Sequence, residues 1–251
     1  MLPTPRALLL DFGGVIVDGP TSPTWAADAA SVVAELLAAA GVDPLPVETV
    51  VEALVADDRA ADASWLVDAP TQHGSEAFWG DVVAATWPAA ARRVVVAHAT
   101  GLSRRLAELK FVRNWQSRPG IADLLAAAAA PGLPMAVVSN TICGAAHRDF
   151  LASAGLAGHF VVQLYTDEQR VRKPNPELVW RATAALGVSP ADCWFVGDTL
   201  SRDVLAARRA GCGAAVLMRS GRVERPPYPD AAPDAVVADP DHLRALLSRL
   251  F

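Results

Sequence analysis

Short apolar runs alternate along this sequence with stretches of helical periodicity, and this alternation limits the folds that the chain can adopt. Apolar runs without alternating polar residues are typical of strands buried on both faces. When helices separate such strands, the chain folds as a doubly wound, Rossmann-like α/β structure with a parallel sheet. Strands are predicted at residues 7–12, 135–140, 160–166, 194–198, 214–219 and 235–239. Helices between and after them are predicted at 121–130, 145–154, 176–186, 202–210 and 242–250.

One long segment interrupts this alternation. Residues 20–115 contain no strand pattern, only helical patterns at 25–40, 47–56, 76–87 and 89–109. A segment of this length is too long for a loop within a compact domain. We therefore expect an α/β core made of residues 1–19 and 116–251, with an all-helical domain inserted at residues 20–115.

Composition excludes several classes of protein. Hydrophobic residues make up 52% and charged residues 20% of the 251 residues, which favours a folded core over disorder. The net charge of −5 gives no reason to expect nucleic-acid binding. Helix-breaking residues interrupt the longest uncharged stretch, 124–147, so no membrane span is predicted. The three cysteines form no CxxC pair, which predicts reduced thiols in the cytoplasm: Cys143, Cys193 and Cys212.

Polar residues gather at the ends of predicted strands, where ligands bind in a doubly wound sheet. Each group alone is typical of a turn, a helix cap or a solvated lysine. Their occurrence together, in this order, indicates one site. The groups are Asp11-Phe12-Gly13-Gly14, Ser139-Asn140, Lys173-Pro174-Asn175-Pro176 and Gly197-Asp198-Thr199.

These residue types fit phosphoryl transfer. A carboxylate such as Asp11 can attack phosphorus and form an aspartyl-phosphate. A magnesium ion bound by Asp11 and Asp198 would neutralise the two anions that must meet. Lys173 and the Ser139 hydroxyl would stabilise charge on the phosphoryl oxygens. For Asp203, contact with the metal and a favourable position at a helix N-terminus are equally open.

These motifs resemble those of the haloacid dehalogenase-like (HAD) superfamily over most of the chain. Residues 8–15 (LLLDFGGV) resemble its first motif, and residues 137–140 (VVSN) its second. Residues 173–176 (KPNP) resemble the third motif. Residues 196–203 (VGDTLSRD), followed by Ala210-Gly211, resemble the fourth. The third and fourth motifs are the most specific.

The resemblance implies a cytoplasmic, magnesium-dependent phosphomonoester hydrolase, monomeric or homodimeric, that acts on a small phosphorylated metabolite of the sugar phosphate or nucleotide class. It makes residues 20–115 a helical cap that closes over the substrate. It implies these roles: Asp11 and Lys173 are catalytic, Ser139, Asn140 and Lys173 bind phosphate, and Asp11, the Gly13 carbonyl, Asp198 and Asp203 bind metal.

Gly13 departs from the pattern of family phosphatases, which commonly carry there a second aspartate as general acid and base. Such catalysis is worth roughly 10²–10⁴-fold. Either the leaving group departs without protonation, or a cap residue or water supplies the proton, or the protein acts mainly by binding.

Three other activities are open on the same fold. A 2-haloacid dehalogenase is the nearest enzyme alternative, although Gly13 stands where that branch carries tyrosine. A phosphonate hydrolase needs a cap lysine, and residues 20–109 contain none. A non-catalytic binding protein is disfavoured because Asp11, Lys173 and Asp198 are all present.

The cap is expected to select the substrate, because the core handles only the phosphoryl group. Five cap residues are candidates for substrate contact, although tryptophans more often pack in cores. Arg59 and His73 are the first choices for mutation, and the others are Trp65, Trp79 and His98.

Overall fold

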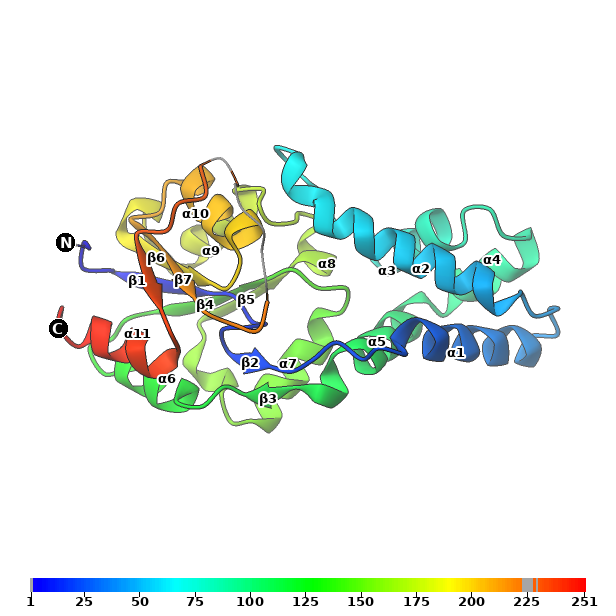
Figure 1. Cartoon of the computed structure of the whole chain (residues 1–251), viewed down its shortest axis with the longest axis horizontal. Helices are drawn as coiled ribbons and strands as arrows, with labels where there is room; N and C mark the ends of the chain where they lie inside the picture. Colours follow the sequence, from blue (N-terminus) through cyan, green and yellow to red (C-terminus); the bar gives the residue numbers. More distant parts are fainter. Residues whose placement is uncertain (1, 223–227, 229) are drawn as a thin grey trace.

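A six-stranded parallel sheet forms the centre of the core, in the order β5-β4-β1-β6-β7-β8 (Figure 1). The computed structural model describes residues 2–222, 228 and 230–251, except the side chains at 64 and 65. The strands are β1 Ala7–Leu10, β4 Met135–Ser139, β5 Val162–Tyr165, β6 Cys193–Gly197, β7 Ala214–Met218 and β8 Ala235–Val237. The predicted α/β fold and its parallel sheet are therefore confirmed.

Helices cover both faces of the sheet because alternate strand residues point to opposite sides. Leu8 and Leu10 pack into one apolar cluster with α6, α7 and α11, whereas Leu9 packs into another with α9 and α10. The core helices are α6 Ile121–Ala129, α7 Gly144–Ser153, α8 Thr166–Gln169, α9 Glu177–Leu186, α10 Leu205–Ala210 and α11 Pro240–Leu247. Short turns of other helix types lie at Ala157–His159, Pro190–Asp192 and Leu200–Val204.

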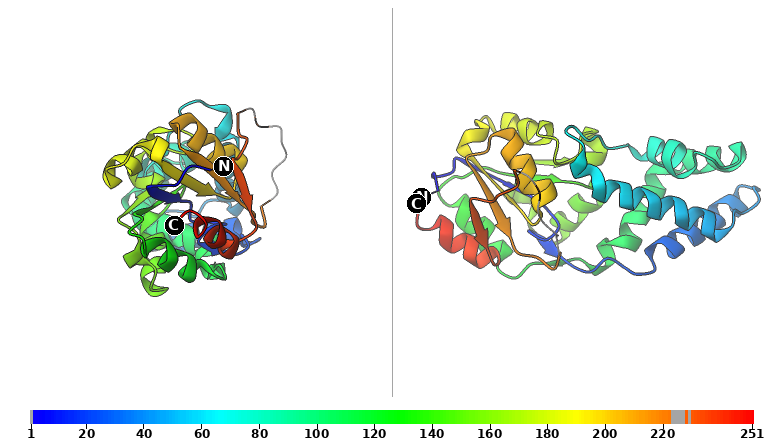
Figure 2. Two further views of the ribbon diagram at one scale, coloured as in Figure 1. Left: turned by 90° about the vertical axis from the view of Figure 1, so that its left-hand side faces the viewer. Right: turned by 45° about the horizontal axis from the view of Figure 1, so that its top comes forward.

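A helical cap extends from the core on the side away from the two chain ends (Figures 1 and 2). Its helices are α1 Trp25–Ala39, α2 Val47–Asp62, α3 Ser75–Ala77, α4 Ala89–Ala97 and α5 Ala99–Lys110, with shorter turns at Ala63–Leu66, Phe78–Val83 and Val112–Asn114. Its apolar residues, including Val33, Leu37 and Trp79, form a separate cluster. Among the described residues no helix has the length and apolarity to cross a membrane. The predicted domain limits at 19/20 and 115/116 stay a prediction.

The helix predicted at 89–109 is two helices that meet at His98. The Nδ1 atom of His98 lies 2.9 Å from the carbonyl oxygen of Val94, the usual i−4 partner of its backbone N–H. That N–H bonds instead to the carbonyl of Val95, at 3.3 Å. A side chain that competes for the i−4 carbonyl disrupts the regular helix, which accounts for the break.

Within the described residues, backbone pairing occurs at two places where the cap joins the core, in addition to side-chain ion pairs such as Arg104–Asp149. The first is the antiparallel pair of β2 Val17–Asp18 and β3 Gln116–Ser117, which joins the segment that enters the cap to the segment that leaves it. This pair was not predicted. Farther along, Thr71 of the cap forms an isolated antiparallel bridge with Val171 of the core. Here the N–H of Arg172 donates to the Pro70 carbonyl at 3.1 Å, and the N–H of Gln72 donates to the Arg170 carbonyl at 3.2 Å.

Candidate active site

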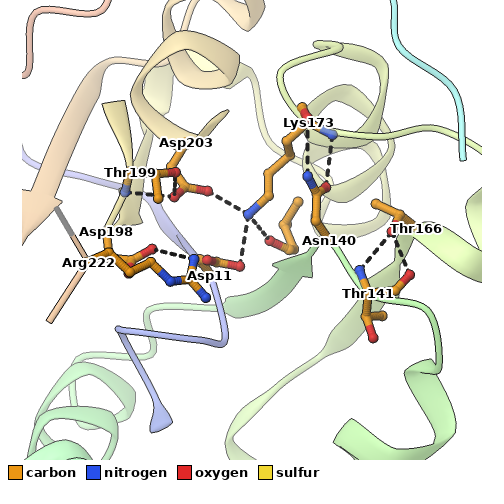
Figure 3. A network of polar contacts seen from close by, with 10 residues as sticks. Asp11, Asn140, Thr141, Thr166, Lys173, Asp198, Thr199, Asp203 and Arg222 are labelled. Carbon is orange, nitrogen blue, oxygen red and sulfur yellow. Dashed lines mark hydrogen bonds and ion pairs between the residues drawn. The ribbon is translucent and has the colours of Figure 1, made fainter. Parts of the chain in front are cut away.

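Lys173 lies at the centre of a buried polar network at the carboxyl ends of the strands (Figure 3). Its Nζ is 2.8 Å from Oδ1 of Asp11 and 2.6 Å from Oδ1 of Asp203, and it donates to the Val138 carbonyl at 2.9 Å. Burial alone would lower the pKa of Lys173, but the two carboxylates outweigh it and the pKa is raised. Lys173 is therefore a fixed cation held beside Asp11.

Both carboxylate oxygens of Asp203 are occupied by partners from the chain. Oδ1 accepts from Lys173, and Oδ2 accepts from the backbone N–H and the hydroxyl of Thr199 at 3.0 and 2.5 Å. Burial, the largest single cause, raises the pKa of Asp203, but the charge and hydrogen bond of Lys173, the hydrogen bond of Thr199 and the charge of Arg202 together lower it overall. A Cβ at Gly197 would lie 2.1 Å from the Cβ of Asp203, so this strand end requires glycine. Asp203 thus orients Lys173 and the loop at Thr199.

Asp198 is a buried carboxylate with fewer partners. It accepts from the Ser220 hydroxyl at 2.7 Å, and Nη1 of Arg222 lies 3.3 Å from its other oxygen. Burial raises the pKa of Asp198 to about 7; Arg222 opposes this shift, and the carboxylates of Asp203 and Asp11 add to it. The site therefore holds more negative charge than its own cations neutralise.

The donor set at this point fits a divalent cation. Asp11, Asp198 and Asp203 each offer a carboxylate oxygen, and these atoms lie within 4.8 Å of one another. Carboxylate oxygens are the ligands that magnesium prefers. Gly13, two residues after Asp11, lines the cavity between core and cap. The three predicted carboxylate ligands are thus neighbours, although Asp203 already satisfies both oxygens with protein donors.

Gly14 allows the first loop to approach Asp198. Its φ is +77°, in the left-handed region that favours glycine, and a Cβ there would lie 2.0 Å from Oδ2 of Asp198. A Cβ at Gly13 would lie 3.0 Å from Nη2 of Arg222, so this arginine occupies space beside the position of the missing second aspartate. Sequence reasoning missed Arg222 because it lies in a loop with no motif, 11 residues beyond Gly211.

The two predicted phosphate-binding residues at the end of β4, Ser139 and Asn140, differ in availability. The amide of Asn140 is engaged with the backbone of Lys173: Nδ2 donates to its carbonyl at 3.1 Å, and Oδ1 accepts from its N–H at 2.9 Å. Ser139 is buried beside the cavity, and its hydroxyl makes no hydrogen bond within the described ranges. Asn140 therefore positions Lys173, while Ser139 has a donor free to bind a ligand.

A cavity of about 800 Å³ lies above this network, between the core and the cap. The core contributes Asp11, Gly13, Ser139, Asn140, Lys173 and Arg222 to its lining. The cap contributes apolar and charged side chains, among them Trp25, Asp57, Asp58, His73, Phe78 and Lys110. The volume suits a small metabolite enclosed by both parts of the molecule.

The cap residues singled out from the sequence have different surroundings. His73 lines the cavity. Trp79 is buried in the cap cluster, and its Nε1 donates to the Ser103 hydroxyl at 3.0 Å, so it packs rather than faces the cavity. Arg59 and His98 lie outside the cavity lining, and the side chain of Trp65 is outside the described part of the chain.

Comparison with known proteins agrees with the motifs. The chain is 37% identical over 139 residues to a phosphoserine phosphatase from Thermus thermophilus, covering 55% of this chain and 54% of that protein. It is 33% identical over 94 residues to a phosphoglycolate phosphatase from Escherichia coli, covering 38% and 36%. The chain thus spans about half the length, or less, of these curated relatives.

The fold is also found among solved structures. A 2-haloacid dehalogenase from Pseudomonas syringae superposes with a TM-score of 0.62 at 21% identity, over 98% of this chain and 99% of that one. At this identity the likeness concerns the fold alone. The sequence profile of the haloacid dehalogenase-like hydrolases matches residues 5–211. The chain belongs to the haloacid dehalogenase-like hydrolases.

Proposed function

We propose that the protein is a magnesium-dependent phosphomonoester hydrolase that acts on a small phosphorylated metabolite through an aspartyl-phosphate at Asp11. The observation that carries this proposal is the buried Asp11–Lys173–Asp203 arrangement, with Asp198 beside it, in which Asp11 and Lys173 line the cavity. The two phosphatases among its relatives support phosphate esters as substrates over haloacids.

In the first step, a carboxylate oxygen of Asp11 attacks phosphorus and the bond to the leaving oxygen breaks. Lys173, held beside Asp11, offsets charge on the transferring phosphoryl group. The free hydroxyl of Ser139 donates to a phosphoryl oxygen. In the second step, water attacks the aspartyl-phosphate, releasing inorganic phosphate and restoring Asp11.

Asp11, Asp198 and the Gly13 carbonyl would hold the magnesium ion, with Asp203 close enough to contribute. Bound there, the ion neutralises the nucleophile and the phosphate so that the two anions can meet. Asp203 acts chiefly by orienting Lys173, because its oxygens already accept from Lys173 and Thr199.

Gly13 itself carries no general acid, and among the described residues the side chain within 4 Å of a Cβ at that position is Arg222. A guanidinium stays protonated, so Arg222 can stabilise negative charge on a leaving oxygen but cannot protonate it. Leaving groups that depart without protonation are therefore expected to react fastest, and an alkoxide leaving group would have to take its proton from water or from a cap residue.

The test is the release of phosphate from p-nitrophenyl phosphate by wild type and by Asp11→Asn, with magnesium or EDTA. The nitrophenolate leaves without protonation, so Gly13 does not mask an intact nucleophile. We expect activity that both EDTA and the substitution abolish, while Asp123→Asn, an exposed change on α6, leaves it intact. Activity unchanged in Asp11→Asn, or chloride release from a 2-haloacid with no phosphate release, would refute the proposal.

A further inference from the structure

Most charged side chains on the cap side of the cavity are paired within the chain. Lys110 forms a close ion pair with Asp58, and its Nζ lies 4.2 Å from the ring centroid of Trp25. Arg202 lies 3.9 Å from Asp62. These pairs leave two charged groups with incomplete partners in the same lining, Asp57 and Arg172.

Arg172 is a cation with one buried donor left over. Its Nη1 donates to Oε1 of Gln72 at 2.6 Å, and its Nη2 is 3.5 Å from the Ala61 carbonyl. Its Nε is buried and has no hydrogen-bond partner in the part of the chain that the structure describes. Burial lowers the pKa of Arg172 to about 10, so the group remains charged at neutral pH. It directly precedes Lys173, at the edge of the phosphoryl site.

Asp57 is the corresponding anion. It projects from α2 into the cavity lining and makes no hydrogen bond or ion pair within the described residues. Burial raises the pKa of Asp57; Arg172 opposes this shift, Asp58 adds to it, and His73 and Lys110 also oppose it. A partly buried carboxylate without a donor is costly, so this position favours a ligand that brings one.

We infer that the substrate is a phosphomonoester whose leaving group carries both an ammonium and a carboxylate, as in a phosphorylated amino acid, with the ammonium at Asp57 and the carboxylate at Arg172. This inference rests on the proposed phosphatase function. It differs from the sugar phosphate or nucleotide class that the family resemblance implies, because those leaving groups bring no ammonium to pair with Asp57.

The test compares four phosphate esters: O-phosphoserine, phosphoethanolamine, which lacks the carboxylate, 3-phosphooxypropanoate, which lacks the ammonium, and p-nitrophenyl phosphate, which lacks both. We expect O-phosphoserine to have the highest kcat/KM of the three aliphatic esters. Loss of either charged group is expected to lower kcat/KM by about 10- to 100-fold, the range of one charge-assisted hydrogen bond.

Variants assign each group to its residue. Asp57→Asn should lower the preference for O-phosphoserine over 3-phosphooxypropanoate by at least tenfold, and Arg172→Gln should do the same for its preference over phosphoethanolamine. Because Arg172 also anchors the Gln72 loop, Arg172→Lys is measured as a second variant that keeps the charge. Asp43→Asn and Arg93→Gln, exposed changes in the cap, serve as matched controls.

Equal kcat/KM for the three aliphatic esters, or preferences that both variants leave unaltered, would overturn the inference. Turnover of p-nitrophenyl phosphate that depends on Asp11 would in that case still support the phosphatase function. Absence of all turnover in wild type and Asp11→Asn alike would instead refute the phosphatase function itself.

Discussion

Replacing Lys173 by methionine removes a cation that is bonded to two buried carboxylates, Asp11 and Asp203. The side chain of Lys173 is 1% exposed, and those of Asp11 and Asp203 are 7% and 0% exposed. Removing one partner of a buried ion pair typically costs about 3–5 kcal/mol, because a buried charge is left uncompensated. We therefore expect Lys173→Met to lower the free energy of unfolding by about 3–5 kcal/mol in metal-free buffer.

The decrease in free energy of unfolding caused by Lys173→Met should depend on pH in a definite direction. The pKa of Asp203 is lowered in the folded wild type, so its stabilising contribution is present above the ordinary pKa, about 3.9, and is lost as pH falls through the folded pKa. The pKa of Lys173 is raised, so its contribution is present below about 10.4 and is lost as pH rises through the folded pKa. In Lys173→Met the Asp203 carboxylate loses the cation that lowers its pKa and can take up a proton instead. The difference in free energy of unfolding between wild type and variant should therefore be smaller at pH 5 than at pH 7.5.

The assay is urea denaturation with EDTA, followed by circular dichroism at both pH values. Lys110→Met is the matched control, since that lysine is also buried but pairs with Asp58, which is 43% exposed. An ion pair with one exposed partner contributes roughly 1 kcal/mol or less. A loss of stability for Lys173→Met no larger than for Lys110→Met, or a difference from wild type that grows in acid, would show that Lys173 does not compensate the buried carboxylates.

Two further predictions concern the metal site. Magnesium at about 100 times its Kd should stabilise wild type by about 2.7 kcal/mol, or roughly 5–10 °C in Tm, and Asp198→Asn should abolish most of this Tm shift. Because burial raises the pKa of Asp198 to about 7, protons should compete with magnesium, and the wild-type Tm shift should become smaller below that pH. A wild-type shift that persists in full at pH 5.5 would contradict this reading. Gly14→Ala should weaken magnesium binding at least tenfold by calorimetry, since its Cβ would displace Asp198, whereas Gly101→Ala, with open space around it, should bind normally.

The sequence predicted those features that depend on local pattern. Unalternating apolar runs such as the one at 7–12 identified buried strands, and polar residues at their ends pointed to one site, where Asp11 lies beside Asp198 and lines a cavity with Ser139. This worked because the carboxyl ends of parallel strands meet at one edge of the sheet. The alternation of buried strands and helices therefore fixed both the fold class and the place of the site.

Other features depend on contacts between distant segments and left no local signal. Arg222 approaches Asp198 from a loop outside any motif, and Arg172 reaches Gln72 of the cap across 100 positions of sequence. The engagement of the Asn140 amide with the Lys173 backbone could not be read from the VVSN motif. The break at His98 depends on which carbonyl its ring contacts, and helical periodicity does not report that choice.

The bridge between Thr71 and Val171 restrains movement of the cap away from the core. Its two backbone hydrogen bonds, Arg172 to Pro70 and Gln72 to Arg170, must break if the cap moves away from the core at this edge. At about 1 kcal/mol net for each bond, this edge would be released in only a few per cent of molecules. If substrate enters by that route, its apparent affinity is reduced by the same fraction. Weakening these two hydrogen bonds would then speed substrate entry, but it would also free the segment that carries Lys173. The same backbone atoms therefore control both substrate access and the position of Lys173.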